Sequence, residues 1–311
     1  MIVCVSLNPA LDRCIWLPAL KHGHVNRASA AEASPGGKAA NVALAARALG
    51  ASVLYVAPLG GPTGQAVEQG LRAFGVEVEA VSVRAPTRVN LELIDEQGVT
   101  EVLEPGSAPA AEELTAVVAR CRQVFESMAA PSLVAFSGSL PPGVDPAFYA
   151  ELVQLAKQRG LRVILDTSGA WLERGLSAKP DFVKPNHEEA EALLGRPITN
   201  ALEAKDAARE LVRRGAEAAI VSLGAAGLVG TDGARACLVA PPRVEARSAV
   251  GSGDAAVAGL ALALERGEAR AAQLTLAAAC GAANCLAESP SQLDPALVED
   301  LRSRCAVSYL D

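Results

Sequence analysis

Short apolar runs alternate with longer amphipathic stretches along most of the chain. The apolar runs occupy residues 2–7, 52–57, 133–138, 162–166, 182–186 and 218–224. Apolar positions recur at helical spacing in residues 38–49, 63–74, 111–128, 146–159 and 201–214. Continuous apolar strands that alternate with helices predict a mostly parallel sheet covered by helices on both faces. We therefore expect an α/β fold of the doubly wound type.

Two segments depart from this pattern. Residues 12–33 and 84–105 contain alternating, more polar stretches such as TRVNLELID and VTEVLEP. Such alternation is typical of antiparallel strands that have one face in solvent. No internal repeat or low-complexity linker divides the sequence. We expect one domain over residues 1–311, in which these two segments form a small β-sheet lid.

The lid segments carry more large apolar side chains than a solvated flap needs. The residues concerned are Ile15, Trp16, Leu17, Leu91, Leu93 and Ile94. A small isolated sheet is marginally stable, and its open edges favour pairing with another chain. The lid is therefore predicted to pack against the lid of a second copy, which makes the protein a homodimer.

Composition narrows the class of partner. The net charge is −7 and the sequence pI is near 5.2, so the basic footprint of a nucleic-acid-binding protein is absent. No apolar run reaches the roughly 18 residues of a membrane span, and the N-terminus has no basic region before its apolar residues, as a signal peptide would. The seven scattered cysteines indicate reduced thiols. We expect a cytoplasmic protein that binds neither nucleic acid nor membrane.

The first candidate for chemistry is the stretch VGSGDAAVAG, at residues 250–259. Free N–H groups at the start of a helix attract anions, and glycines let the backbone approach them closely. Asp254 would then lie in the first helical turn beside bound phosphate. The alternative is helix capping alone, because a carboxylate is also favourable near the positive end of the helix dipole.

A second glycine-rich turn precedes a helix at PGGKAAN, residues 35–41. Lys38 and Asn41 are three residues apart and share a helical face. A lysine in the first turn opposes the helix dipole, which favours a ligand-binding role. The alternative is a lysine that is merely exposed to solvent.

Polar side chains also follow or lie on several predicted strands. In TRVN, Arg88 and Asn90 point to the same face of a strand, and an arginine fork suits a phosphate; an exposed strand arginine is the alternative. In KPNHEE, Asn186 and Glu189 share a helical face and supply the oxygen ligands that Mg²⁺ prefers, while a plain N-cap explains Asn186 equally well. Asp12 ends NPALD, and an aspartate there can hold sugar hydroxyls or make a turn.

These motifs, taken in order, resemble those of the ribokinase-like, or pfkB, family of carbohydrate kinases. The resemblance rests on NPALD, GGKAAN, TRVN, SGSLPPG, DTSG, KPNHEE, VSLGAAG and VGSGDAAVAG, and so covers nearly the whole chain. NPALD, HVNR, TRVN and SGSLPPG are similar to the branch that acts on phosphorylated ketohexoses, which contains 1-phosphofructokinases and tagatose-6-phosphate kinases. The fold that it implies is a doubly wound α/β domain with a β-lid, frequently a homodimer joined through the lid.

The resemblance also implies residue roles. Asp254 is the implied catalytic base, beside an anion hole of Gly251, Ser252 and Gly253. The implied contacts of the sugar phosphate are Asp12, Gly37, Lys38, Asn41, Arg88, Asn90 and Ser139. The implied contacts of ATP are Lys184, Asn186, Ser222, Gly224, Gly227 and Asn284. Mg²⁺ is implied at Asn186 and Glu189.

The implied reaction is ATP-dependent phosphorylation of fructose 1-phosphate to fructose 1,6-bisphosphate. Tagatose 6-phosphate is the alternative substrate, and a non-catalytic regulator that binds a sugar phosphate is the alternative from another class. Two departures from the family pattern stand out. Ala39 replaces the last glycine of GGKG, which narrows the backbone conformations at that position, and NCLAESPSQLDP lacks the glycine-rich adenine loop that is expected after Asn284.

Overall fold

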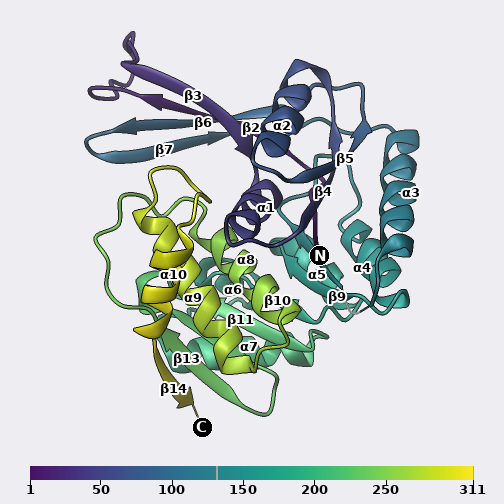
Figure 1. The fold of residues 1–311 in the computed structure, drawn as a ribbon, viewed down its shortest axis with the longest axis vertical. Helices are drawn as coiled ribbons and strands as arrows, with labels where there is room; N and C mark the ends of the chain where they lie inside the picture. Colours follow the sequence, from purple (N-terminus) through teal and green to yellow (C-terminus); the bar gives the residue numbers. More distant parts are fainter. Residues whose placement is uncertain (131, 311) are drawn as a thin grey trace.

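The computed structural model describes residues 1–130 and 132–310. Ten strands within these residues form one large sheet (Figure 1). These strands are β1 (Ile2–Val5), β4 (Val53–Leu59), β5 (Glu77–Ser82), β8 (Leu133–Ser137), β9 (Arg162–Asp166), β10 (Phe182–Val183), β11 (Ala218–Ser222), β12 (Leu228–Thr231), β13 (Ala236–Ala240) and β14 (Ala306–Leu310). Their order in the sheet is β14-β13-β12-β11-β10-β9-β8-β1-β4-β5. The strands from β5 to β11 are parallel, whereas β12, β13 and β14 pair in antiparallel fashion.

Helices cover both faces of this sheet. One face packs against α1 (Lys38–Ala48), α2 (Gly61–Ala73), α8 (Ser252–Glu265), α9 (Arg270–Leu286) and α10 (Pro295–Ser303). The other packs against α3 (Ala111–Ser127), α4 (Phe148–Gln158), α5 (Gly169–Leu176), α6 (His187–Leu194) and α7 (Ala201–Arg213). In strand β1, Ile2 and Cys4 pack into the core on one face of the sheet, and Val3 and Val5 pack into the core on the other. Because both faces are buried, every position of this strand is apolar. The predicted doubly wound α/β fold is confirmed.

The order of the strands creates a crevice at one end of the sheet. From β1 the chain continues to β4 and β5 on one side, and later places β8, β9, β10 and β11 on the other. The direction of winding therefore reverses between β1 and β8. Crevices outside the carboxyl ends of the strands at such a reversal are where open α/β sheets bind ligands.

A second, smaller sheet projects from the main body (Figure 1). It consists of β3 (Ala30–Gly36), β2 (Ala10–Trp16), β6 (Arg88–Asp95) and β7 (Gly98–Leu103), in that order. The alternating segments thus form a small sheet, as expected, but the antiparallel pairing is wrong for its central pair, because β2 and β6 are parallel. Ala10 pairs with Arg88 where both strands begin, so both run in the same direction, and β3 and β7 pair antiparallel to them.

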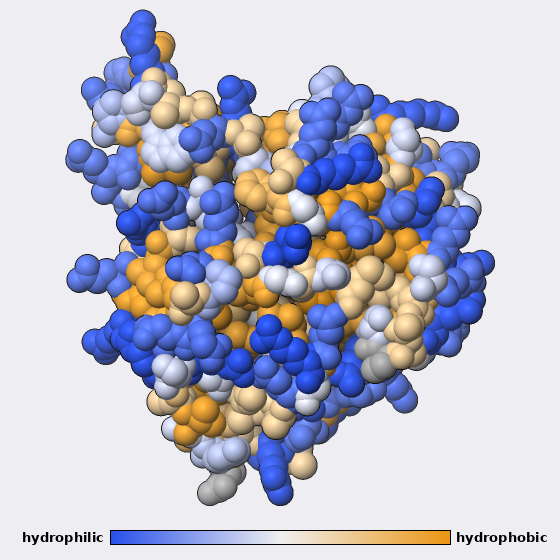
Figure 2. Space-filling view, viewed as in Figure 1, coloured by the Kyte–Doolittle hydropathy of each residue, from blue (hydrophilic) through white to orange (hydrophobic). Residues whose placement is uncertain are grey.

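The small sheet is far less buried than the main sheet. In Figure 2 its projecting end is mostly hydrophilic, with apolar positions between the polar ones. Leu103 is 59% exposed and Val102 is 49% exposed, whereas every residue of β1 is buried. No helix in the described part of the chain combines the length and the apolar character that crossing a membrane requires.

Candidate active site

A large cavity lies between the carboxyl ends of the main-sheet strands and the small sheet. Its volume is about 1200 Å³, which exceeds the usual range for one small ligand. Strands β1, β8, β9, β10 and β11 each end at it, and helices α1, α8 and α9 also contribute to its walls. The space is therefore large enough for two substrates side by side.

The turn before α8 forms one end of this cavity. Gly251 is the N-cap of α8 and has a φ of 76°, a left-handed conformation that glycine adopts without steric cost. Helix geometry leaves the N–H groups of Gly253 and Asp254 without an intrahelical acceptor, so they are suited to an anion. The Ser252 N–H already donates to the Ala249 carbonyl. Ser252 therefore contributes less to an anion hole than its neighbours do.

Asp254 is buried in the first turn of α8, with 6% of its surface exposed. The Asn41 amide on α1 donates to its Oδ2 atom at 2.9 Å. Burial raises the pKa of Asp254 to about 7, against the opposing effects of Lys38, the Asn41 hydrogen bond and Lys184. A carboxyl with a pKa near neutrality is well matched to accept a proton at physiological pH.

Lys38 lies among carboxylates at the same end of the cavity. Its Nζ atom is 3.3 Å from Glu189 Oε1 and 3.9 Å from Asp166 Oδ2. The charges of Asp166, Glu189 and Asp254 raise the pKa of Lys38 although the residue is partly buried, so this lysine stays protonated. Ala39 follows as a buried residue inside α1, where helical backbone needs no glycine.

Asp166 was not among the site residues that the motifs indicated. It ends β9, is 1% exposed, and lies 3.2 Å from Lys184 Nζ through its Oδ1 atom. Neither carboxylate oxygen of Asp166 accepts a hydrogen bond within the described chain. The only sign in the sequence was its place at the end of a buried strand, directly before TSG.

Asn186 and Glu189 form a capping box at the start of α6. The Glu189 N–H donates to Asn186 Oδ1 at 2.7 Å, and the Asn186 N–H donates to Glu189 Oε2 at 2.9 Å. The N-cap alternative for Asn186 is therefore correct for the free protein. Both residues also line the cavity, and the Glu189 side chain is 20% exposed there.

The donor set at this end fits a hydrated Mg²⁺ ion. Among the described lining residues, seven carboxylates face four lysine and arginine side chains, and the buried oxygens of Asp166 accept no hydrogen bond. No three described His, Cys, Asp or Glu side chains come together as a metal site. Mg²⁺ usually keeps several waters and takes one or two carboxylates together with phosphate oxygens, and Glu189 with Asn186 matches that requirement.

The small sheet supplies the opposite end of the cavity. Asp12 Oδ1 accepts from the Asn90 amide at 2.8 Å, and Asp12 Oδ2 accepts from the Gly37 N–H at 3.3 Å. Burial raises the pKa of Asp12. Glu92 follows on the same face of β6, where the Cys14 thiol donates to it at 3.3 Å. This wall consists largely of hydrogen-bond acceptors, which suits a ligand rich in hydroxyl groups.

Arg88 is the first residue of β6 and lines the large cavity. Its guanidinium donates to the backbone carbonyls of Asn8, at 3.3 Å, and Glu104, at 2.6 Å. Asn8 in turn donates to Ser139 Oγ at 3.1 Å. These contacts hold the arginine fork in place beside Ser139, so that its remaining N–H groups can meet a phosphate.

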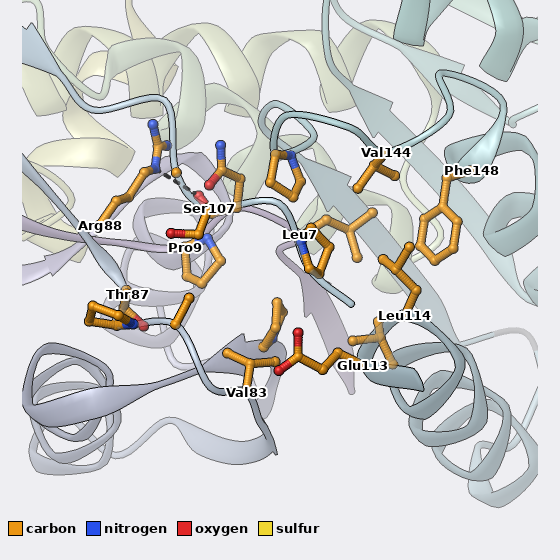
Figure 3. Close-up of a pocket in the computed structure, with 18 residues that line it drawn as sticks. Leu7, Pro9, Val83, Thr87, Arg88, Ser107, Glu113, Leu114, Val144 and Phe148 are labelled. Atoms are coloured by element: carbon orange, nitrogen blue, oxygen red, sulfur yellow. Dashed lines mark hydrogen bonds between the residues drawn. The ribbon is translucent and has the colours of Figure 1, made fainter. Parts of the chain in front are cut away.

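Arg88 and Asn8 also border a second, small cavity of about 50 Å³ (Figure 3). Arg88 marks one end of it, and Leu114, Val144 and Phe148 gather at the other. A space of this size holds a few water molecules. This cavity is too small to hold a substrate.

The nucleotide-side residues lie around β11 and α9. Ser222, Gly224 and Gly227 line the large cavity. Asn284 does not: it is 3% exposed, and its amide donates to the Val250 carbonyl at 2.7 Å and its oxygen accepts from the Ser291 N–H. Asn284 thus holds the turn before α8 from behind, and its neighbours Gly281 and Cys285 line the cavity in its place.

The large cavity gathers all the other residues that the motifs indicated. The expected residues that line it are Asp12, Gly37, Lys38, Asn41, Arg88, Asn90, Ser139, Lys184, Asn186, Glu189, Ser222, Gly224, Gly227, Gly251, Ser252, Gly253 and Asp254. The lining residues that the motifs missed include Ser6, Asn8, Glu92, Glu101 and Asp166. A doubly wound fold with an anion-binding turn, a buried carboxyl and a hydroxyl-binding wall is the arrangement of a phosphoryl-transferring enzyme.

Comparisons with known proteins identify the family. Residues 5–296 match the model of the pfkB family carbohydrate kinases, and the chain belongs to this family. It is 38% identical over 261 residues to a 1-phosphofructokinase of Rhodobacter capsulatus. This alignment covers 83% of this chain and 82% of that protein. It is accordingly an ATP-dependent sugar-phosphate kinase.

Two solved structures show the same fold over nearly the full length. The tetrameric inhibited form of phosphofructokinase-2 from Escherichia coli matches with a TM-score of 0.90 at 31% identity, covering 97% of this chain and 98% of that chain. A possible 1-phosphofructokinase from Thermotoga maritima matches with a TM-score of 0.90 at 26% identity, covering 100% of this chain and 99% of that chain.

Proposed function

We propose that this kinase is a 1-phosphofructokinase, which transfers the γ-phosphoryl group of ATP to fructose 1-phosphate and releases fructose 1,6-bisphosphate and ADP. The observation that carries the proposal is the placement of Asp254 and the turn before α8 across one cavity from Asp12, Asn90 and Arg88. The likeness to the Rhodobacter capsulatus protein supports the choice of sugar.

Asp254 acts as the general base in this proposal. The O–H bond of the attacking sugar hydroxyl breaks, its proton passes to the Asp254 carboxylate, and its electron pair forms the new O–P bond. The bond between the γ-phosphorus and its bridging oxygen breaks, and those electrons leave with ADP. The free backbone N–H groups of Gly253 and Asp254 at the start of α8 offset the charge that develops on the transferring group.

ATP lies along the β11 side of the cavity in this scheme. Ser222, Gly224 and Gly227 border the nucleotide, and Lys184 approaches its phosphates. Glu189 and Asn186 hold Mg²⁺, which neutralises phosphate charge when bound. Lys38 contacts Glu189 and Asp166, and this supports a role toward the transferring phosphoryl group in place of the implied contact with the sugar's existing phosphate.

The sugar phosphate lies along the small sheet. Arg88, with Ser139 and Asn90 nearby, meets its existing phosphate, since a guanidinium binds phosphate oxygens through two N–H groups at once. Asp12, Gly37 and Asn41 meet its hydroxyl groups. The acceptor-rich wall around Asp12 favours hydroxyl donors and disfavours a second phosphate there.

The small sheet acts as a lid over the sugar and as the dimer interface. A lid that excludes water keeps the γ-phosphoryl group from hydrolysis. Val102 is exposed on β7 and pairs with Leu91 of β6, and Leu91 and Leu93 are only partly buried. A second copy packed lid to lid covers such positions and supports the sheet.

A coupled assay of ADP release tests the substrate. Fructose 1-phosphate, tagatose 6-phosphate and fructose 6-phosphate are compared at equal concentration, with Asp254→Asn as the control for background hydrolysis. Fructose 1-phosphate should give the highest kcat/KM. A higher value for tagatose 6-phosphate would make the protein a tagatose-6-phosphate kinase, and sugar binding without ADP release from any of the three would make it a non-catalytic regulator.

A further inference from the structure

The contact between Asn41 and Asp254 joins two helices that are distant in the sequence. Asn41 lies in the first turn of α1 and Asp254 in the first turn of α8, and the residues are 213 positions apart. Both side chains are at least nine-tenths buried, and the Asn41 amide donates to Asp254 Oδ2 at 2.9 Å. A hydrogen bond between two buried groups fixes the rotamer of the carboxylate more firmly than an exposed one does.

We infer that Asn41 is a positioning residue for the general base: by holding Oδ2, it presents Oδ1 of Asp254 to the sugar hydroxyl and favours the ionised carboxylate before the sugar binds. This inference rests on the proposed role of Asp254. It gives Asn41 a function in proton transfer in addition to the contact with a sugar hydroxyl that the family resemblance implies. The two functions differ in what their loss does to the pH dependence of the reaction.

The charged groups that face Asp254 define the sign of this effect. Lys38 from α1 and Lys184 after β10 favour the carboxylate, whereas Asp166 at the end of β9 and burial disfavour it. The Asn41 amide adds to the favourable side, because a hydrogen bond to the charged form lowers the pKa of a carboxyl group. Removing the amide should therefore raise the pKa of Asp254 and leave it protonated over a wider range of pH.

The test compares two asparagine variants in one cavity. Asn41→Ala removes the donor to Asp254, and Asn90→Ala removes a donor to Asp12 that does not touch Asp254. The kcat/KM for fructose 1-phosphate is measured from pH 5.5 to 9.5 with saturating ATP, because this ratio reports ionisations of the form that is free of sugar. Both variants lose a candidate sugar contact, so both should show a raised sugar KM.

Only Asn41→Ala should move the acid limb of the profile, by about one pH unit toward higher pH, as expected for loss of a hydrogen bond to a charged group. Its deficit against the wild type should therefore shrink as the pH rises. Asn41→Asp, which keeps the size but places a second carboxylate at Asp254, should move the limb in the same direction. Thermal melts of each variant monitor folding.

A deficit of Asn41→Ala that is the same at every pH would overturn the inference and leave Asn41 as a sugar contact alone. Failure of the proposed function would be recognised by a different result: the Asp254→Asn variant would retain the turnover and the acid limb of the wild type.

Discussion

The two sheets form opposite walls of one cavity, and their burial differs. In the main sheet every residue of β1 is buried between two helical layers, so the turns that follow its strands are fixed by a close-packed core. In the small sheet most residues of β7 are exposed, and polar side chains make the contacts within the cavity. In the proposed scheme the main-sheet wall holds the groups for the transfer step, and the small sheet holds the groups that recognise the sugar.

This difference predicts that changes on the two walls affect different kinetic constants. A residue at the end of the main sheet acts on a group that changes charge during the reaction, and so it should affect kcat. A residue of the small sheet binds a part of the sugar that does not react, and so it should affect KM.

The largest effect is expected on the main-sheet wall, for Asp254→Asn. The amide cannot accept the proton of the hydroxyl, and loss of a general base typically lowers the rate about 10²–10⁴-fold. Because Asn is nearly the same size, the fold and the binding of ATP should be preserved. Steady-state kcat for ADP release measures this, and a variant that keeps half of the wild-type value would exclude Asp254 as the base.

The next largest effect is expected on the small-sheet wall, for Arg88→Ala. Loss of a charged hydrogen bond typically costs about 1.5–3 kcal/mol, so the KM for the sugar phosphate should rise by roughly one to two orders of magnitude. The KM for ATP should stay close to that of the wild type. Arg84, an exposed arginine four residues earlier, gives the matched control, since Arg84→Ala should change neither constant. An unchanged sugar KM for Arg88→Ala would assign Arg88 a structural role.

The smallest effect is expected for Val102→Glu, at an exposed position of β7 beside Leu91. A charge at the proposed lid-to-lid contact should shift the protein from dimer to monomer in sedimentation velocity, and the sugar KM should rise several-fold because each lid loses its support. A matched change at Phe74, which is exposed after α2, should leave the dimer intact. Wild-type protein that sediments as a fully active monomer at micromolar concentration would contradict this interface.

The sequence was most informative where one short segment determines its own structure. The glycine pair before Asp254 and the capping residues Asn186 and Glu189 act within a few positions, so their turn and helix start were predictable. The apolar runs likewise identified the main sheet, since burial on both faces leaves no polar position in a strand. The small sheet was predictable from the alternation of apolar and polar residues in its strands.

Contacts between distant segments were not predictable in this way. Asp166 reaches Lys38 and Lys184 only because β9 and β10 are neighbours and α1 begins beside the end of β9. The parallel pairing of β2 with β6 joins residues about 78 positions apart, for example Asp12 with Asn90, and alternation within either strand carries no information about its direction. The family resemblance implied an ATP contact for Asn284. Its side chain instead makes hydrogen bonds to Val250 and Ser291 and does not line the cavity.

The division between the two walls is tested most directly by calorimetric titration of fructose 1-phosphate into Asp254→Asn and Arg88→Ala, beside their turnover numbers. We expect Asp254→Asn to bind the sugar phosphate within a few-fold of the wild type while turnover is lost. Arg88→Ala should bind it at least tenfold more weakly and retain most of its kcat at saturation. Equal loss of sugar affinity in both variants, or a kcat that falls as far in Arg88→Ala as in Asp254→Asn, would contradict the account.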